Sequence, residues 1–340
     1  MKVLAIDNVA EIVKRHGFRE YIEDLMKTLE RDFGRWQEFN KIPRPAMRVP
    51  HGVLELMPIC DDEYYSFKYV NCHPKNPASG LMTVVATGQL STVDTGYPIL
   101  FSELTLLTAM RTAATSALAT RLMARPDSRV LTMIGTGAQG EFQMRATQIV
   151  CGITEVRYFD ADPKAMDKFE RNLKGTTLKA VRCQDAEEAV KGADIITVCT
   201  ACKGHVDVIK DAWVRPGMHI NALGGDTVGK TELEVSIIPR CRVVVEYFDQ
   251  SFVEGEIQRF SLDEARKLVL CELEKLVTGE KPGRETVDEI TLFDSVGIGL
   301  EDYSTLRLTY ALAERYGIGE ERDFVPGPDD PKDLFSVIKY

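Results

Sequence analysis

A glycine-rich hexapeptide constrains the fold of this chain more than any other part of its sequence. Gly135-Thr136-Gly137-Ala138-Gln139-Gly140 directly follows an apolar run, 129–134, and directly precedes a helical pattern over 141–150. In a strand–loop–helix unit with this spacing, the first glycine allows a tight turn and the second lets a pyrophosphate approach the backbone. The third lets the helix pack closely. The hexapeptide therefore predicts a loop that binds a dinucleotide at the N-terminus of a helix.

An acidic residue follows this unit at the position that a dinucleotide site requires. The next strand-like run, 155–159, ends at Asp160, which lies 25 residues after Gly135. A carboxylate there accepts hydrogen bonds from a ribose 2′-OH and repels a 2′-phosphate, so it favours NAD over NADP. The alternative is a glycine-rich turn with no ligand. We disfavour it because strand, glycines, helix and acid occur in the required order.

Short apolar runs continue to alternate with helical stretches through the middle of the chain. The runs after Asp160 are Ile195–Cys199, Met218–Asn221, Val243–Val245 and Ile290–Phe293. Strands that alternate with helices imply crossover connections and a parallel sheet covered on both faces. The predicted fold class is therefore α/β, with a Rossmann-type doubly wound sheet over residues 120–303. In such a sheet, ligands bind beyond the carboxyl ends of the strands.

The two ends of the chain show a different pattern, which predicts a second domain of the α+β class. Residues 9–33 have the apolar spacing of one amphipathic surface helix, and 81–101 resemble a hairpin that turns through Asp94-Thr95-Gly96. A long helix should follow, capped by Ser102 and ending near Arg125. A further helix is predicted over 303–316, and the Pro- and Asp-rich tail after it should fold back onto the first domain. We assign residues 1–119 with 304–340 to this domain.

The composition excludes several classes of protein. There are 52 acidic and 42 basic residues and no basic stripe, which argues against nucleic-acid binding. No run of about 18 apolar residues is present, so no membrane span is predicted. An early acid, Asp7, argues against a signal peptide, and eight scattered cysteines suit a reducing cytoplasm. Cys199 and Cys202 form a C-x-x-C, but no second ligand pair or suitably spaced histidine accompanies them, so no metal site is predicted.

Five segments of the chain together resemble the ornithine cyclodeaminase/μ-crystallin family, and within it the bacterial ornithine cyclodeaminases. The resemblance covers nearly the whole chain, in order and with the family's spacing. The Lys68 and Arg111 segments are specific to the family, whereas the glycine motif is not. The segments are 67–76, 94–98, 107–116, the hexapeptide at 135–140, and Asn221-Ala222-Leu223-Gly224-Gly225-Asp226, which is followed by Lys230-Thr231-Glu232-Leu233.

The resemblance implies a homodimer that uses tightly held NAD to convert L-ornithine into L-proline and ammonia. It implies substrate contacts from Arg44, Lys68 and Arg111 to the carboxylate, from Glu55 to the amine end, and from Val296. It also implies that Asp226 is the catalytic acid/base. The residues that it implies for NAD binding are Thr83, Arg111, Gly135, Gly137, Ala138, Gln139, Asp160, Thr200, Asn221, Ala222, Leu223, Gly224, Lys230 and Ser295.

The implied chemistry explains why these residue types are needed. Arg and Lys fix the substrate carboxylate through charge-assisted hydrogen bonds, so that the Cα–H faces the nicotinamide. Asp226 removes a proton from the amine as hydride leaves Cα. The side-chain amine then closes a five-membered ring on the iminium, ammonia leaves, and the NADH still in place returns the hydride. Water must be excluded, because it would hydrolyse the first imine to a keto acid.

Other interpretations remain open at this stage. The chain resembles other NAD-dependent enzymes on the same fold, namely an amino-acid dehydrogenase, a lysine cyclodeaminase or a ketimine reductase. A ligand-binding protein without activity is disfavoured, because the carboxylate clamp and Asp226 are both present. Individual residues also have structural alternatives. Arg44 and Lys68 are compatible with surface charges, Arg111 with a solvent-facing helix position, and Asp226 with the cap of a helix that begins near Thr231.

Overall fold

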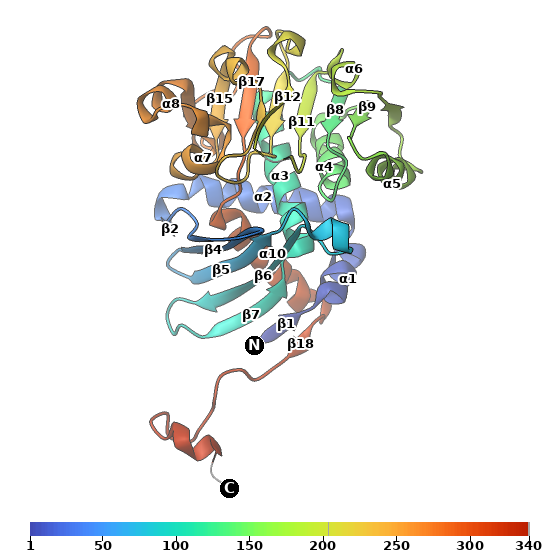
Figure 1. Cartoon of the computed structure of the whole chain (residues 1–340). Coiled ribbons are helices and arrows are strands. Elements are labelled where there is room, and N and C mark those ends of the chain that lie inside the picture. Colours follow the sequence, from blue (N-terminus) through green and yellow to red (C-terminus); the bar gives the residue numbers. More distant parts are fainter. Residues whose placement is uncertain (203, 339–340) are drawn as a thin grey trace.

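The computed structural model describes residues 1–202 and 204–338, and it contains two eight-stranded sheets that lie at opposite ends of a layer of helices (Figure 1). The α/β fold class predicted from the sequence is confirmed. A third, two-stranded sheet pairs β12 (His205–Ile209) with β14 (Thr231–Leu233).

The second sheet is parallel throughout, in the order β10-β9-β8-β11-β13-β17-β15-β16. The chain runs outward from β8 through β9 to β10, and then returns to the other side of β8 at β11. The carboxyl ends of β8 and β11 therefore form the switch point at which doubly wound sheets bind ligands. Its strands are β8 (Val130–Ile134), β9 (Glu155–Phe159), β10 (Lys179–Arg182), β11 (Ile195–Val198), β13 (His219–Ala222), β15 (Cys241–Val245), β16 (Val269–Glu272) and β17 (Ile290–Asp294).

The first sheet is mostly antiparallel and combines strands from both ends of the chain. Its order is β18-β1-β7-β6-β5-β4-β2, and β3 pairs with β4 beside β2. The predicted hairpin is present, because β6 and β7 are antiparallel neighbours. The strands are β1 (Lys2–Leu4), β2 (Asn40–Lys41), β3 (Ala46–Val49), β4 (Gly52–Cys60), β5 (Tyr64–Cys72), β6 (Val84–Thr92), β7 (Pro98–Glu103) and β18 (Glu320–Glu321).

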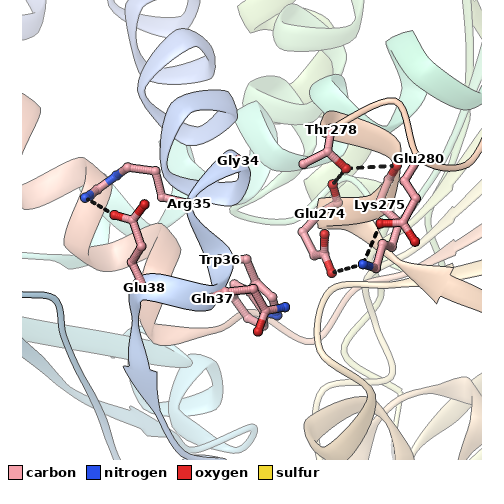
Figure 2. Close-up of a pocket in the computed structure, with 9 residues that line it drawn as sticks. All are labelled: Gly34, Arg35, Trp36, Gln37, Glu38, Glu274, Lys275, Thr278 and Glu280. Atoms are coloured by element: carbon pink, nitrogen blue, oxygen red, sulfur yellow. Dashed lines mark hydrogen bonds and ion pairs between the residues drawn. The ribbon is translucent and has the colours of Figure 1, made fainter.

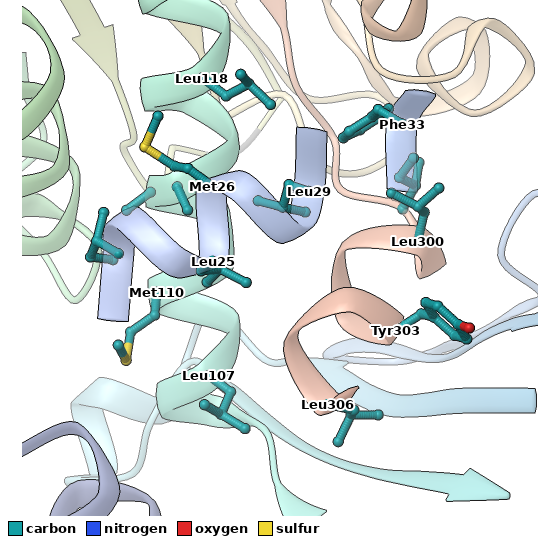
Figure 3. Close-up of a cluster of buried hydrophobic side chains, with 14 of the residues drawn as sticks. Leu25, Met26, Leu29, Phe33, Leu107, Met110, Leu118, Leu300, Tyr303 and Leu306 are labelled. Atoms are coloured by element: carbon teal, nitrogen blue, oxygen red, sulfur yellow. The ribbon is translucent and has the colours of Figure 1, made fainter. Parts of the chain in front are cut away.

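Three long helices form the layer between the sheets: α2 (Phe18–Gly34), α3 (Thr105–Met123) and α10 (Gly299–Tyr316). Apolar side chains from all three interlock in one core, which Figure 3 shows. α3 contacts β6 of the first sheet and β13 and β17 of the second, so a residue on α3 can face both. The predicted domain boundaries, after 119 and after 303, fall inside α3 and α10 and stay predictions.

The remaining helices cover the faces and edges of the two sheets. The α-helices are α1 (Ile6–His16), α4 (Gly140–Cys151), α5 (Pro163–Leu173), α6 (Ala186–Val190), α7 (Phe248–Glu254), α8 (Leu262–Leu268) and α9 (Leu273–Val277). The 3-10 segments are Trp36–Glu38, Asn76–Ser79, Asp211–Trp213, Val235–Arg240, Glu256–Arg259 and Leu334–Ile338. No helix within the described residues is long and apolar enough to cross a membrane.

Three local expectations were wrong. The single helix predicted over 9–33 is two helices, because Gly17 lies between them with a φ of 95° that an α-helix does not accommodate. Ser102 belongs to β7 rather than capping the next helix, and the Glu103 carboxylate accepts hydrogen bonds from the first amides of α3 instead. The C-terminal tail does not fold back, since it projects away from the body beyond β18 (Figure 1).

Candidate active site

The glycine loop after β8 has the geometry that a dinucleotide needs. Gly135 has a φ of 94°, and a Cβ on it would lie 2.6 Å from the carbonyl oxygen of Cys199. A Cβ on Gly137 would meet nothing within 4 Å, so the backbone there is open to a ligand. A Cβ on Gly140 would lie 3.3 Å from the ring of Phe169 on α5. Because α4 begins at Gly140, its free amides point towards the loop, and a pyrophosphate fits this arrangement.

Two polar groups beside the loop are placed for the same ligand. The Asp160 carboxylate, just after β9, accepts hydrogen bonds from the backbone amides of Thr136 at 2.6 Å and Asp162 at 2.9 Å. Gln139 lies between the loop and α4, and its buried side-chain oxygen has no hydrogen-bond partner within the described residues. A buried acceptor without a partner is costly, and a bound ligand with a donor there removes that cost.

The ends of β11, β13 and β17 lie side by side next to the loop. The amide of Leu223 donates to the carbonyl of Val198 at 2.9 Å, and that of Ser295 donates to Ala222 at 3.0 Å. The Lys230 ammonium bridges two of these segments, because it donates to the Thr200 carbonyl at 3.2 Å and to an Asp226 carboxylate oxygen at 3.1 Å. The segments that carry predicted cofactor residues after these three strands therefore lie along the same edge of the parallel sheet, at the carboxyl ends of its strands.

Two predicted cofactor residues, Asn221 and Thr83, have hydrogen-bond partners away from the glycine loop. The Asn221 side chain is fully buried and donates to Thr120 on α3 at 2.9 Å, so its amide faces the interior. Thr83 precedes β6 in the first sheet, and its carbonyl accepts from the amide of His73 at 2.8 Å. Within the described residues, neither side chain forms a hydrogen bond with the glycine loop, and both cofactor roles stay predictions.

Lys68 on β5 and Arg111 on α3 meet at one carboxylate, that of Asp302 on α10. Lys68 Nζ lies 3.0 Å from Asp302 Oδ1, and Arg111 Nε lies 3.2 Å from the same oxygen. A second acid, Glu301, accepts from Arg111 Nη1 at 2.5 Å. All four side chains are buried. The surface-charge interpretation of Lys68 and the solvent-facing interpretation of Arg111 are therefore wrong.

Arg44 connects the first sheet to the loop after β13. It lies between β2 and β3, and its side chain is only 8% exposed. Arg44 Nε donates to Glu254 on α7 at 2.7 Å and lies 3.3 Å from Glu55 Oε1 on β4. Its Nη2 donates to the backbone carbonyl of Asp226 at 3.0 Å. These contacts hold the predicted acid/base loop against the carboxylate clamp, which we define as Arg44, Lys68 and Arg111.

Asp226 is the most accessible charged group of this junction. Its side chain is 39% exposed and accepts from Lys230. The helix-cap interpretation of Asp226 is wrong, because the segment that follows at Thr231 is strand β14. Burial by itself would lower the pKa of Lys230, but the carboxylates of Asp226 and Glu232 raise it above its usual value. The ammonium therefore stays charged beside Asp226.

Burial sets the titration of the other charged groups. It lowers the pKa of Lys68 to about 8, together with the nearby charge of Arg111. It raises the pKa of Glu55 above its ordinary value, although Arg44 opposes the rise. The Glu232 carboxyl, which accepts from the Thr200 hydroxyl, has its pKa raised by burial to about 7. Proton-accepting groups near neutrality are therefore concentrated at this junction.

The acids that hold the clamp were not identified from the sequence. Glu254, Glu301 and Asp302 pair with its cations, and Glu246 accepts from the backbone amides of Val296 and Gly297 at 3.0 and 2.6 Å. The one available signal was the consecutive pair at 301 and 302, shortly after Val296. Acids are common in the first turn of any helix, so this signal was weak.

Cysteine and histidine chemistry does not contribute to the junction. Cys199 donates its thiol to the Gly135 carbonyl at 3.3 Å, and burial raises the pKa of that thiol. His73 lies in the loop after β5, and its Nδ1 is 3.2 Å from Asn71 Oδ1. Within residues 1–202 and 204–338, no group of three potential ligands could hold a metal ion, and all eight cysteines are free.

A surface pocket lies elsewhere, between the end of α2 and α9 (Figure 2). It is lined by Gly34, Arg35, Trp36, Gln37, Glu38, Glu274, Lys275, Thr278 and Glu280. Its acids pair with its own cations, as the dashed lines in Figure 2 show for Glu38 and Glu274. A small recess beside the clamp is lined in part by Arg44, Met57 and Gly297.

Comparisons with known proteins identify the family of this chain. The family model described as "Ornithine cyclodeaminase/mu-crystallin family" matches residues 6–316. An ornithine cyclodeaminase from Agrobacterium fabrum (strain C58) is 44% identical over 335 residues, which cover 98% of this chain and 94% of that protein.

Two solved structures are similar over almost the whole chain. A lysine cyclodeaminase, described for its recognition of L-lysine, L-ornithine and L-2,4-diaminobutyric acid, has a TM-score of 0.92 at 31% identity and covers 98% of each chain. An archaeal alanine dehydrogenase dimer with bound NAD has a TM-score of 0.87 at 31% identity, covering 96% of this chain and 99% of that one. This chain belongs to the ornithine cyclodeaminase/μ-crystallin family, and the predictions of an enzyme and of NAD as its cofactor are confirmed at the level of that family.

Proposed function

We propose that this chain is an ornithine cyclodeaminase, which converts L-ornithine into L-proline and ammonia with NAD. The observation that carries the proposal is the junction of the carboxylate clamp with Asp226 at the carboxyl edge of the parallel sheet. The relative that is 44% identical over nearly the full chain supports the same activity.

The cofactor would lie across the glycine loop and the adjoining strand ends. Gly135, Gly137, Ala138 and Gln139 would hold its pyrophosphate, and Asp160 would bind the adenosine ribose. Bound NAD supplies a hydride acceptor and, in its reduced form, a hydride donor. The residues that would complete its site are Thr83, Arg111, Thr200, Asn221, Ala222, Leu223, Gly224, Lys230 and Ser295.

The clamp would bind the α-carboxylate of the substrate. Arg111 uses Nη1 and Nε for Glu301 and Asp302, which leaves its remaining N–H groups for a ligand. Its orientation is already fixed by these two acids, so little side-chain entropy is lost on binding. Val296 follows β17 and precedes Gly297, on which a Cβ would lie 2.6 Å from Arg111 Nη1. Val296 would contact the aliphatic part of the substrate.

Asp226 would accept the proton of the α-amine. It is the accessible carboxylate of the junction, and it is paired with Lys230 at 3.1 Å. Glu55 Oε1 is buried and lies 3.3 Å from Arg44 Nε, but it accepts no hydrogen bond within the described residues, so it can accept from an amine of the substrate. The burial of Glu55, Lys68 and Arg111 would keep water away from an imine, whose hydrolysis would divert the reaction.

The second candidate is an NAD-dependent amino-acid dehydrogenase, favoured by the similarity to alanine dehydrogenase. The two functions differ in net redox change. With ornithine and a catalytic amount of NAD, we expect proline and ammonia to accumulate without a steady-state rise in NADH absorbance. A keto acid formed with stoichiometric NADH would refute the cyclodeaminase. Lysine is assayed as the competing substrate. It is one methylene longer than ornithine, and a difference of that size changes the binding free energy by only ~1–3 kcal/mol.

Replacing Asp160 by Ala should weaken NAD binding and relax the discrimination against NADP. The change removes both the acceptor for the ribose hydroxyl and the charge that repels a 2′-phosphate. The ratio of dissociation constants for NAD and NADP, measured by calorimetry, reports this directly. Asp162→Ala is the matched control, since Asp162 caps α5 two residues away and should leave the ratio unchanged. An unaltered ratio in Asp160→Ala would count against the ribose assignment.

The homodimer predicted from the resemblance has a suitable surface on the first sheet. α10 contacts β4, β5 and β6, and several apolar side chains on the other face of these strands are exposed. Leu56, Tyr65, Tyr69 and Val85 define this face, and Leu56 and Tyr69 are paired across β4 and β5. Exposed apolar patches of this kind mark protein interfaces. We propose that a second copy of the chain covers this face. The cytoplasmic location expected from the sequence likewise stays a prediction.

Placing charges on this face should separate the two copies. We expect the double variant Leu56→Lys with Tyr69→Glu to have the mass of a monomer in light scattering after size-exclusion chromatography, because a desolvated charge opposes burial of the face. Val287→Glu is the control, since Val287 is more exposed but lies in the loop before β17. A dimeric double variant would show that the interface lies elsewhere.

A further inference from the structure

Among the residues that the structure describes, Asp302 is the one carboxylate that contacts two cations of the clamp. It lies in the first turn of α10 and is completely buried. Lys68 Nζ is 3.0 Å from its Oδ1 and 2.9 Å from its Oδ2, and Arg111 Nε is 3.2 Å from Oδ1. The two cations come from β5 and α3, which are far apart in sequence. Their meeting point is therefore set by a residue on a third element.

The local charges make such an anion necessary. Lys68 is 1% exposed, and Arg111 and Arg44 both act on it as like charges. Of the acids that face Lys68, Asp302 from α10 is in direct contact, and Glu55 from β4 acts from a greater distance. A buried ammonium beside two guanidinium groups tends to lose its proton unless an anion is paired with it. The Asp302 carboxylate is the anion that contacts the Lys68 ammonium directly.

Asp302 itself is poorly suited to bind the substrate carboxylate. It has the same sign of charge as that group, and both of its oxygens already face cations. Its influence must pass through Lys68 and Arg111. We propose that Asp302 is a positioning residue, which fixes the ammonium of Lys68 and the guanidinium of Arg111 in one carboxylate-binding arrangement and holds Lys68 in its charged form. This inference rests on the proposed function, in which these two cations bind the substrate.

The test measures carboxylate binding rather than turnover alone. The probe is 5-aminopentanoate, which keeps the carboxylate and terminal amine of ornithine but lacks the α-amine whose own titration would confuse a pH profile. Its affinity for the NAD-loaded protein is followed by calorimetry from about pH 6 to about pH 10. In the native protein the affinity should fall above about pH 8, where the buried Lys68 loses its proton.

Asp302→Asn should move this fall in affinity to lower pH. Lys68 is charged below its pKa, and the asparagine leaves it facing Arg111 and Arg44 without an anion in contact, so the charge is lost at lower pH than before. A displacement of about one pH unit corresponds to roughly tenfold weaker binding at pH values well above both midpoints. For ornithine, KM should rise more than kcat falls.

Two further variants separate charge from position and from general stability. Asp302→Glu keeps the charge but moves it, so the midpoint should stay near that of the native protein while affinity drops; it also decides the matter if Asp302→Asn does not fold. Asp32→Asn is the matched control, because Asp32 is an equally buried acid that contacts α10 through Ser304 and Arg307 but no clamp cation. It should change neither midpoint nor affinity.

The outcomes distinguish this inference from the proposed function. If the native protein binds 5-aminopentanoate and Asp302→Asn has the same affinity and midpoint, the role of Asp302 is refuted and the cyclodeaminase is not. An unchanged affinity in Asp302→Glu would likewise refute the proposal that Asp302 fixes the positions of Lys68 and Arg111. If the native protein binds no carboxylate probe and turns over no ornithine, the clamp itself is wrong, and this inference is overturned with it.

Discussion

Replacing Asp226 by Asn is expected to reduce kcat for ornithine by about 10³-fold, while the affinity for NAD stays nearly unchanged. Asparagine has almost the shape of aspartate, so the backbone carbonyl of residue 226 should still accept from Arg44 at the same place. The amide cannot take a proton from the substrate amine. The variant therefore removes the proton acceptor and leaves the site assembled.

Two measurements and a control variant separate this role from a structural one. Steady-state rates with ornithine give the loss of turnover, and calorimetric titration with NAD gives the retained affinity. Asp207→Asn is the control, because Asp207 on β12 is similarly exposed and pairs with Arg259 away from the junction. Turnover close to that of the native enzyme in Asp226→Asn would eliminate Asp226 as the acid/base.

The parallel sheet was predictable from sequence because its signals are local. Strand, glycine loop, helix and following acid are encoded within residues 129–160, and the buried strands of a parallel sheet are short runs of apolar residues. β10 and, in the two-stranded sheet, β12 were missed because much of their surface is exposed or half-buried, so their residues lack such a run. β16 was missed because its short apolar run directly follows the last residue of helix α8. The helix boundary at Gly17 was missed because the apolar spacing continues across it.

The candidate site was predictable only in part, for a physical reason. The cations could be identified because the segments around Lys68 and Arg111 are specific to the family. Their partners come from 190 to 234 residues away along the chain. Acids such as Glu301 and Asp302 are normally solvated in the first turn of a helix, and no sequence pattern shows that α10 is packed against β5 and α3. The long-range packing of the helix layer turns these ordinary residues into part of the site.

Replacing Arg111 by Lys should raise KM for ornithine by about 10²-fold, although the charge is kept. The guanidinium presents separate N–H groups to Glu301, to Asp302 and to a ligand, and one ammonium cannot reach all three in this geometry. A loss of about 10²-fold corresponds to ~2.7 kcal/mol, which is within the range for a hydrogen bond to a charged group. kcat should fall less, because Asp226 is untouched.

The same substitution should lower the melting temperature, more strongly at alkaline pH. Burial holds the pKa of Glu301 well above its usual value, and Arg111 opposes this rise. Without the guanidinium, Glu301 keeps its proton in the folded state while the unfolded chain releases it above about pH 4.5, so the free energy of unfolding decreases as pH rises. Arg121→Lys is the matched control on the same helix, since Arg121 pairs with Glu30 at the surface. Both variants keep the positive charge, so only the geometry of the guanidinium distinguishes Arg111 from Arg121. Equal KM values and melting curves for Arg111→Lys and Arg121→Lys would therefore show that the guanidinium of Arg111 binds no carboxylate.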